Sequence, residues 1–135
     1  MPTDFLSRCE VLEECYEFML AYAAQGLPAD TGVPSGGQLR ELLRRAAAAL
    51  SGIAEAYSSA VPEPAGAYQP FLAVLKRDAA DALAAIELVR AQPALSSQLI
   101  DNLNASIHLR ALLTDLFLID EALKGHLAPA RAESS

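Results

Sequence analysis

Four stretches of the chain repeat apolar residues at alternating spacings of four and three, and each stretch is bounded by proline or glycine. This spacing gathers apolar side chains on one face of an α-helix, so each stretch predicts an amphipathic helix. The helices are expected over residues 4–25, 38–59, 70–91 and 97–124. Their matched lengths, roughly 30–40 Å each, predict an all-α, antiparallel up-down four-helix bundle with a ferritin-like shape.

One domain is expected to hold all four helices, over residues 1–127, followed by a flexible tail over 128–135. The clearest apolar seam belongs to the second helix and consists of Leu39, Leu43, Ala46, Leu50, Ile53 and Tyr57. Hydrophobic residues make up 53% of the chain but aromatic residues only 6%, which favours closely packed helices over sheets.

The formal net charge of -7 argues against binding to nucleic acid or to anionic membranes, because both need basic surfaces. No secretory leader is recognisable at the N-terminus, so a cytoplasmic location is expected. Two cysteines, Cys9 and Cys15, lie six residues apart on the first predicted helix. They point in different directions around that helix, which predicts buried, reduced thiols rather than a disulfide between them.

The fourth predicted helix is apolar on nearly all sides between Ile107 and Ile119. A helix in a single bundle keeps one face in water, so this pattern predicts a homo-oligomer with the fourth helix at the subunit contact. The residues expected at this interface are Leu109, Leu112, Leu113, Leu116, Phe117 and Ile119.

No constellation of residues predicts a catalytic, cofactor-binding or metal site. A di-iron bundle needs Glu-x-x-His motifs, and the chain has none. The carboxylates on the first and third helices, such as Glu10 and Asp78, are interpreted as solvated faces. The sequence His108-Leu109-Arg110-Ala111 is similar in kind to a histidine phosphotransfer motif, but it lacks the small glycine.

Asn104, His108 and Asp115 fall near one line along the fourth predicted helix. Two interpretations are open: a buried polar network or titrating site, or else a narrow polar stripe that faces water or a hydrogen-bonded core histidine. No nucleophile is paired with His108, so a structural role is expected for it.

Two stretches resemble a known family: YEFMLAYAAQG, from Tyr16 to Gly26, and SSQLIDNLNASIHLRALLTDLF, from Ser96 to Phe117. They are similar to the small bacterioferritin-like helical proteins encoded beside α-carboxysome genes. The resemblance implies a cytoplasmic bundle linked to carbon fixation. The absent Glu-x-x-His ligands put iron oxidation in doubt.

Together these observations predict a non-enzymatic helical accessory or assembly protein that acts through protein–protein contacts. Two alternatives stay open: a ferritin-like metal-binding or redox protein, and a signalling bundle that resembles histidine phosphotransfer domains.

Overall fold

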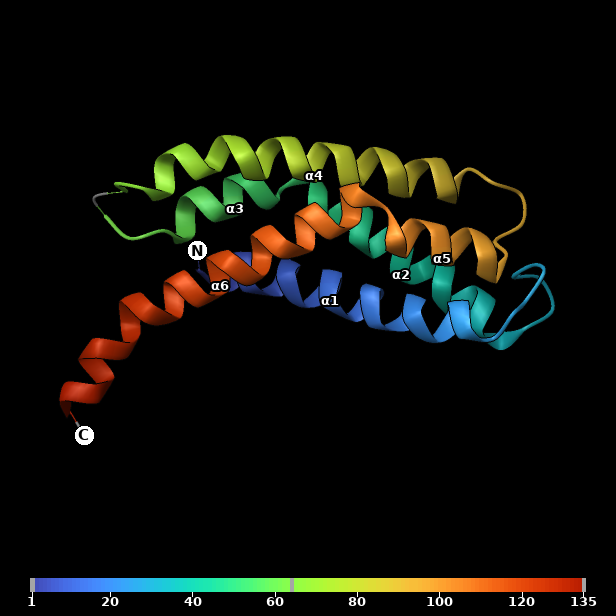
Figure 1. Cartoon of the computed structure of the whole chain (residues 1–135), viewed down its shortest axis with the longest axis horizontal. Helices are drawn as coiled ribbons and strands as arrows, with labels where there is room; N and C mark the ends of the chain where they lie inside the picture. The colour runs from blue at the N-terminus through green and yellow to red at the C-terminus, as the bar shows by residue number, and fades with distance from the viewer. Residues whose placement is uncertain (1, 64, 135) are drawn as a thin grey trace.

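The protein is all-helical in the computed structural model, which describes residues 2–63 and 65–134, with side chains for 4–63 and 65–125. Six helices are present in that part of the chain (Figure 1). They are α1 (Pro2–Ala24), α2 (Pro34–Ser51), α3 (Ile53–Ala60), α4 (Tyr68–Arg90), α5 (Ser97–Ala105) and α6 (Ile107–Ser134). The all-α prediction is therefore confirmed.

The largest differences from the predicted boundaries are in the second and fourth helices. The second predicted helix begins four residues earlier, at Pro34, and is divided into α2 and α3 at Gly52. The fourth is divided into α5 and α6 at Ser106. The backbone of α6 also continues through the predicted tail to Ser134, but the side chains beyond residue 125 lie outside the described residues. The mobility of that tail stays a prediction.

An arginine from α1 lies against the break at Gly52. The Nη1 atom of Arg8 donates hydrogen bonds to the carbonyl oxygens of Ala48 and Ala49, at 3.2 and 3.0 Å. These carbonyls belong to the last turn of α2, which the helix itself leaves without partners. A Cβ atom at residue 52 would lie 2.8 Å from the guanidinium of Arg8, so only glycine fits there without displacing the arginine.

A serine precedes each of the last two helices, α5 and α6. Ser96 precedes α5, and its Oγ accepts a hydrogen bond from the backbone N–H of Leu99 at 3.0 Å. Ser106 has an extended backbone, and its Oγ accepts from the N–H of Leu109 at 3.3 Å. Both contacts have the form of N-caps. The second restarts the helix inside a continuous apolar pattern.

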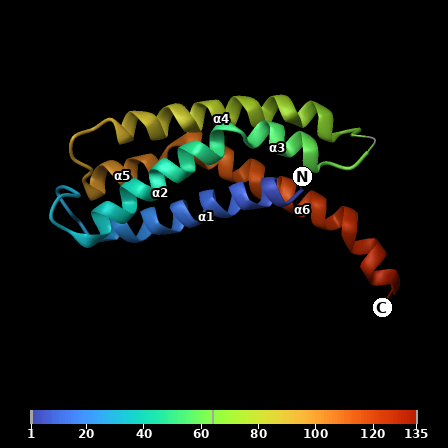
Figure 2. The same cartoon turned by 180° about the vertical axis from the view of Figure 1, so that it is seen from behind.

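The helices pack around one apolar core. α1 contacts α2, α3 and α5, while α4 contacts α2, α3, α5 and α6. In Figures 1 and 2, α2 and α3 run along one side of the molecule between α1 and α4, and α5 and α6 run along the other. Every residue of the seam predicted for the second helix is at most 4% exposed. In the described part of the chain, no helix is long and apolar enough to cross a membrane.

Leu50→Ala and Ile86→Ala are each expected to lower the free energy of unfolding by about 2–5 kcal/mol, because each leaves a cavity in this core. The two side chains are 4% and 1% exposed. Glu14→Ala is the control, because Glu14 is exposed and reaches Arg45 only at 3.6 Å. Urea melts should separate the three variants, and melts within about 0.5 kcal/mol of wild type for both core variants would contradict this packing.

Candidate interaction surface and buried polar groups

Five of the six residues predicted at the subunit interface lie in the core of the chain itself. Leu109, Leu112, Leu113, Leu116 and Ile119 are each at most 5% exposed. They share the inner arc of α6 and pack within the chain's own core cluster. The prediction is therefore corrected for these five, because a side chain already buried in its own subunit is not free to contact another. Phe117, which is 51% exposed, stays available.

The outer side of α6 carries a different apolar stripe. Its members are spaced by four, three, four and four residues, which places them on one line along the helix. They are Ile107, Ala111, Thr114, Leu118 and Ala122. Ile107 is 74% exposed and Leu118 is 59% exposed, and Phe117 lies beside the stripe. We name these five residues, together with Phe117, the α6 outer face.

An apolar pocket of about 340 Å³ adjoins the α6 outer face where α6 passes α3 and α4. Its lining residues are Tyr57, Ala67, Tyr68, Phe71, Leu118, Ile119 and Ala122. The hydroxyl of Tyr57 donates to the carbonyl oxygen of Tyr68 at 2.7 Å, which leaves aromatic carbon facing the pocket. Leu118 and Ala122 belong to both features, so the stripe and the pocket form one continuous surface.

The predicted polar line of Asn104, His108 and Asp115 does not form a network. In the described part of the chain, no hydrogen bond joins any two of these side chains. His108 is exposed, whereas Asn104 and Asp115 are 6% and 7% exposed. The break at Ser106 separates Asn104 from the other two. The water-facing interpretation therefore holds for His108 and fails for the two residues on either side of it.

His108→Gln is expected to change the free energy of unfolding by less than about 0.5 kcal/mol, because the side chain is exposed near the start of α6. Thermal or urea melts measure this directly. A loss above about 1 kcal/mol would show that the imidazole makes a structural contact.

Asp115 faces a second carboxyl group across the contact between α6 and α4. Its Oδ2 atom is buried and receives no hydrogen bond from a donor among the described residues. The side chain of Asp78, in α4, lies within hydrogen-bonding reach. Burial, followed by the hydrogen bond and charge of Asp78, raises the pKa of Asp115 to about 8. At neutral pH Asp115 is therefore largely protonated.

A buried carboxylate that the sequence patterns did not single out lies near the C-terminal end of α4. Asp30, in the loop between α1 and α2, is 7% exposed. It accepts hydrogen bonds from Arg40 Nε at 2.6 Å and from the backbone N–H of Leu95 at 2.8 Å. Its hydrogen bond with Arg40 is the main reason that the pKa of Asp30 lies below its usual range. No motif pointed to these contacts, since Leu95 is 65 residues away in the chain.

Further hydrogen bonds join the same two loops. Ser97 Oγ donates to the carbonyl oxygen of Tyr22 at 2.6 Å and accepts from the N–H of Leu27 at 2.8 Å. The hydroxyl of Tyr22 donates to the carbonyl oxygen of Leu95 at 2.7 Å. These groups are buried or partly buried and paired, so they fix the loop after α1 against the loop before α5. This arrangement is structural, because the partners of each group are other groups of the chain.

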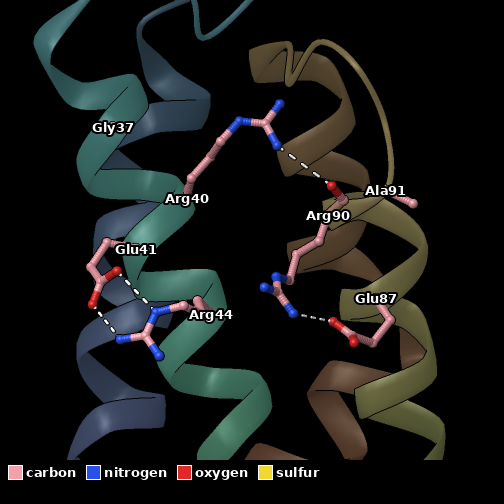
Figure 3. Close-up of a pocket in the computed structure, with 7 residues that line it drawn as sticks. All are labelled: Gly37, Arg40, Glu41, Arg44, Glu87, Arg90 and Ala91. Carbon is pink, nitrogen blue, oxygen red and sulfur yellow. Dashed lines mark hydrogen bonds and ion pairs between the residues drawn. The ribbon is translucent and has the colours of Figure 1, made fainter.

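A groove between α2 and α4 gathers three arginines, but their charges are balanced locally (Figure 3). Arg44 pairs with Glu41 and Arg90 with Glu87 along their own helices. Arg40 pairs with Asp30 and also reaches the carbonyl oxygen of Gln92 at 3.2 Å. Each guanidinium already faces a carboxylate, so the groove offers an incoming anion no unpaired positive charge among these three.

The remaining candidates for chemistry are the thiols and the acidic residues. Cys9 and Cys15 are free and buried, as expected, and burial raises the pKa of each thiol to about 12. In the part of the chain that the structure describes, no three His, Cys, Asp or Glu side chains are placed to hold a metal ion. The arrangement therefore offers an apolar surface more readily than a reaction centre.

Comparison of the chain with protein-family models, curated proteins and solved structures finds no match.

Proposed function

We propose that the protein is a helical accessory or assembly protein that acts through protein–protein contacts made by the α6 outer face. In this proposal the fold is an up-down four-helix bundle whose second and fourth arms are broken, at Gly52 and Ser106. The order of the contacts supports this arrangement, since α1 and α4 each pack against elements of both broken arms.

The observation that carries the proposal is the exposure of large apolar side chains on one helix face. Ile107, Phe117 and Leu118 are all more than half exposed, and the pocket beside them is lined by apolar and aromatic residues. Scattered exposed leucines are ordinary on a protein surface, whereas a continuous apolar stripe beside a pocket is typical of an interaction site. A partner that covers this stripe removes apolar area from water, which favours association.

The resemblance to proteins encoded beside α-carboxysome genes suggests the cellular process in which the protein acts. The first similar stretch, 16–26, covers the end of α1, and the second, 96–117, covers α5 and the first half of α6. The second stretch includes Ile107, Thr114 and Phe117 of the α6 outer face. We infer a cytoplasmic role in assembling or supporting a carbon-fixing compartment.

Replacing Leu118 with lysine tests the proposal, because a charge in the stripe opposes burial by any partner. Tagged wild-type protein in an extract of its own cells should elute at a larger size than the purified protein. Leu118→Lys should shift most of the tagged chain to the smaller size. Leu88→Lys is the matched control, since Leu88 is 67% exposed on α4 and lies outside the stripe; it should leave the complex unchanged.

Two outcomes would overturn the proposal in favour of another function. Metal near one ion per chain in purified protein would promote the ferritin-like alternative. Acid-labile phosphate that is lost in His108→Gln would promote phosphotransfer. Equal elution of wild type and Leu118→Lys would show that the α6 outer face makes no contact.

A further inference from the structure

We propose that two copies of the chain pair through their α6 outer faces in antiparallel orientation, with Ile107 of each copy seated over the pocket of the other. This inference rests on the proposed function, because it names the first partner of that surface. Four features of the α6 outer face carry it: the symmetry of the stripe, the charges beside it, the absence of acidic residues along it, and the match between a projecting side chain and a pocket.

The stripe is symmetric about its centre. If a two-fold axis passes near Thr114, Ile107 of one copy lies opposite Ala122 of the other, and Ala111 lies opposite Leu118. Both pairs follow from one axis, so the apolar residues match along the whole stripe. A symmetric dimer requires this self-complementarity, because the same patch contributes both sides of the contact.

The flanking charges favour the antiparallel orientation. Arg110 and Glu121 are exposed and lie on the same flank of the stripe, eleven residues apart in the sequence. In an antiparallel pair, the same flanks of the two helices meet. Arg110 of each copy then lies near Glu121 of the other, and the contact is made twice. A parallel pair would instead place the two copies of Arg110 on opposite flanks of the contact, and each would lie about 16 Å along the axis from Glu121 of the other copy.

The exposed residues of the stripe also lack the acidity of the rest of the chain. The protein has 17 acidic and 10 basic residues, so two copies repel each other over most of their surface. The exposed positions of α6 from Ile107 to Leu118 include no Asp or Glu, because the single acidic residue in that span, Asp115, is buried. The outer side of α1 is different, since Glu10, Glu13 and Glu17 are exposed on it.

Ile107 and the pocket are complementary in shape and chemistry. Ile107 is the most exposed large apolar side chain among the described residues, at 74%. In the antiparallel register it faces Ala122 of the second copy, which lines the pocket with Leu118 and Tyr68. A pocket of about 340 Å³ has room for a branched aliphatic side chain. The pairing therefore buries this exposed apolar side chain in an apolar pocket, twice in each dimer.

Disulfide trapping in the purified full chain tests the register. The double variant Ile107→Cys with Ala122→Cys should form a covalent dimer in mild oxidant. Ile107→Cys alone should not, because the two copies of residue 107 would lie about 22 Å apart along the antiparallel helices. Within one chain, residues 107 and 122 are separated by the same distance and cannot cross-link. The native cysteines add no background, since both are buried.

A charge exchange tests the orientation in the native surface. Arg110→Glu and Glu121→Arg should each weaken dimerisation, measured by sedimentation at low salt, by about fivefold, because each removes two exposed pairs. The variant that carries both changes should return to wild-type affinity. Because both side chains are exposed, none of these variants is expected to lose the fold, and circular dichroism checks this.

Each remaining outcome has a definite meaning. A wild-type chain that is monomeric at about 100 µM would overturn this inference, and so would a covalent dimer formed by Ile107→Cys alone, which indicates parallel pairing. Neither result contradicts the proposed function, which is decided by the complex in cell extract. If the purified chain forms this dimer but Leu118→Lys leaves the extract complex unchanged, the result would support the dimer and overturn the proposed function.

Discussion

Asp30→Ala is expected to lower the free energy of unfolding by about 1–3 kcal/mol, because it removes the buried acceptor of a backbone N–H and the counter-charge of a partly exposed arginine. The carboxylate of Asp30 accepts hydrogen bonds from Arg40 and from the N–H of Leu95, and it is 7% exposed. Without it, the N–H of Leu95 is buried and unpaired, and the guanidinium of Arg40 loses its counter-charge. Denaturant melts at pH 7 measure the loss.

Two variants and a change of pH separate this ion pair from a surface one. Glu41→Ala removes a carboxylate that pairs with Arg44 at 2.6 Å but is exposed, and it should be close to neutral. Asp30→Asn keeps an acceptor for Leu95 and should cost less than alanine. The pKa of Asp30 is lowered by folding, so its contribution is present above about pH 4 and is lost as pH falls through the folded pKa. The difference between wild type and Asp30→Ala should therefore shrink in acid, and a constant difference would contradict the ion-pair explanation.

Asp115→Asn is expected to stabilise the protein at pH 8.5 by roughly 2–4 kcal/mol and at pH 5 by about a quarter of that amount. Folding raises the pKa of Asp115 to about 8, so the folded protein holds its proton more tightly than the unfolded chain. The wild type therefore loses stability as pH rises from about 4 to about 8. Asparagine cannot ionise, and its amide can donate to Asp78 at every pH. The expected gain is smaller than the whole pKa shift multiplied by about 1.4 kcal/mol per pKa unit, because helices α4 and α6 can relax.

The control for this prediction is Asp81→Asn, which removes an exposed carboxylate from α4, the helix that also carries Asp78. It should be nearly neutral at both pH values. Urea melts at pH 5, 7 and 8.5 provide the comparison. A stability difference between Asp115→Asn and wild type that does not grow with pH would show that Asp115 is ionised throughout.

The regular parts of the fold were predictable because they depend on local periodicity. The seam from Leu39 to Tyr57 follows from residue spacing alone, and the structure buries all of it. The breaks are different in kind. The one at Gly52 lies against Arg8, about forty residues away, and no local pattern encodes that contact. The one at Ser106 had a visible signal, a serine able to cap a helix, but the strong apolar pattern on both sides concealed it.

Five of the six residues predicted at the subunit interface lie on the side of α6 that faces the core. The apolar run from Ile107 to Ile119 contains two sets of residues, one in the core and one on the surface. The sequence alone does not separate the two sets, because both are apolar. Burial separates Leu112 and Leu116 from Ile107 and Leu118. The pairing of Asp115 with Asp78, and of Asp30 with Arg40 and Leu95, depends on which helices and loops become neighbours. That information enters only with the tertiary structure.

The burial of the two thiols on α1 has a kinetic consequence. With a pKa of about 12 at Cys9 and Cys15, roughly one thiol in 10⁵ is ionised at neutral pH, and only the thiolate reacts quickly with alkylating reagents. Labelling therefore has to wait until α1 leaves the core. The rate of modification therefore reports how often that helix opens. Because Cys9 and Cys15 lie at different positions along α1, their separate rates distinguish fraying of one end from release of the whole helix.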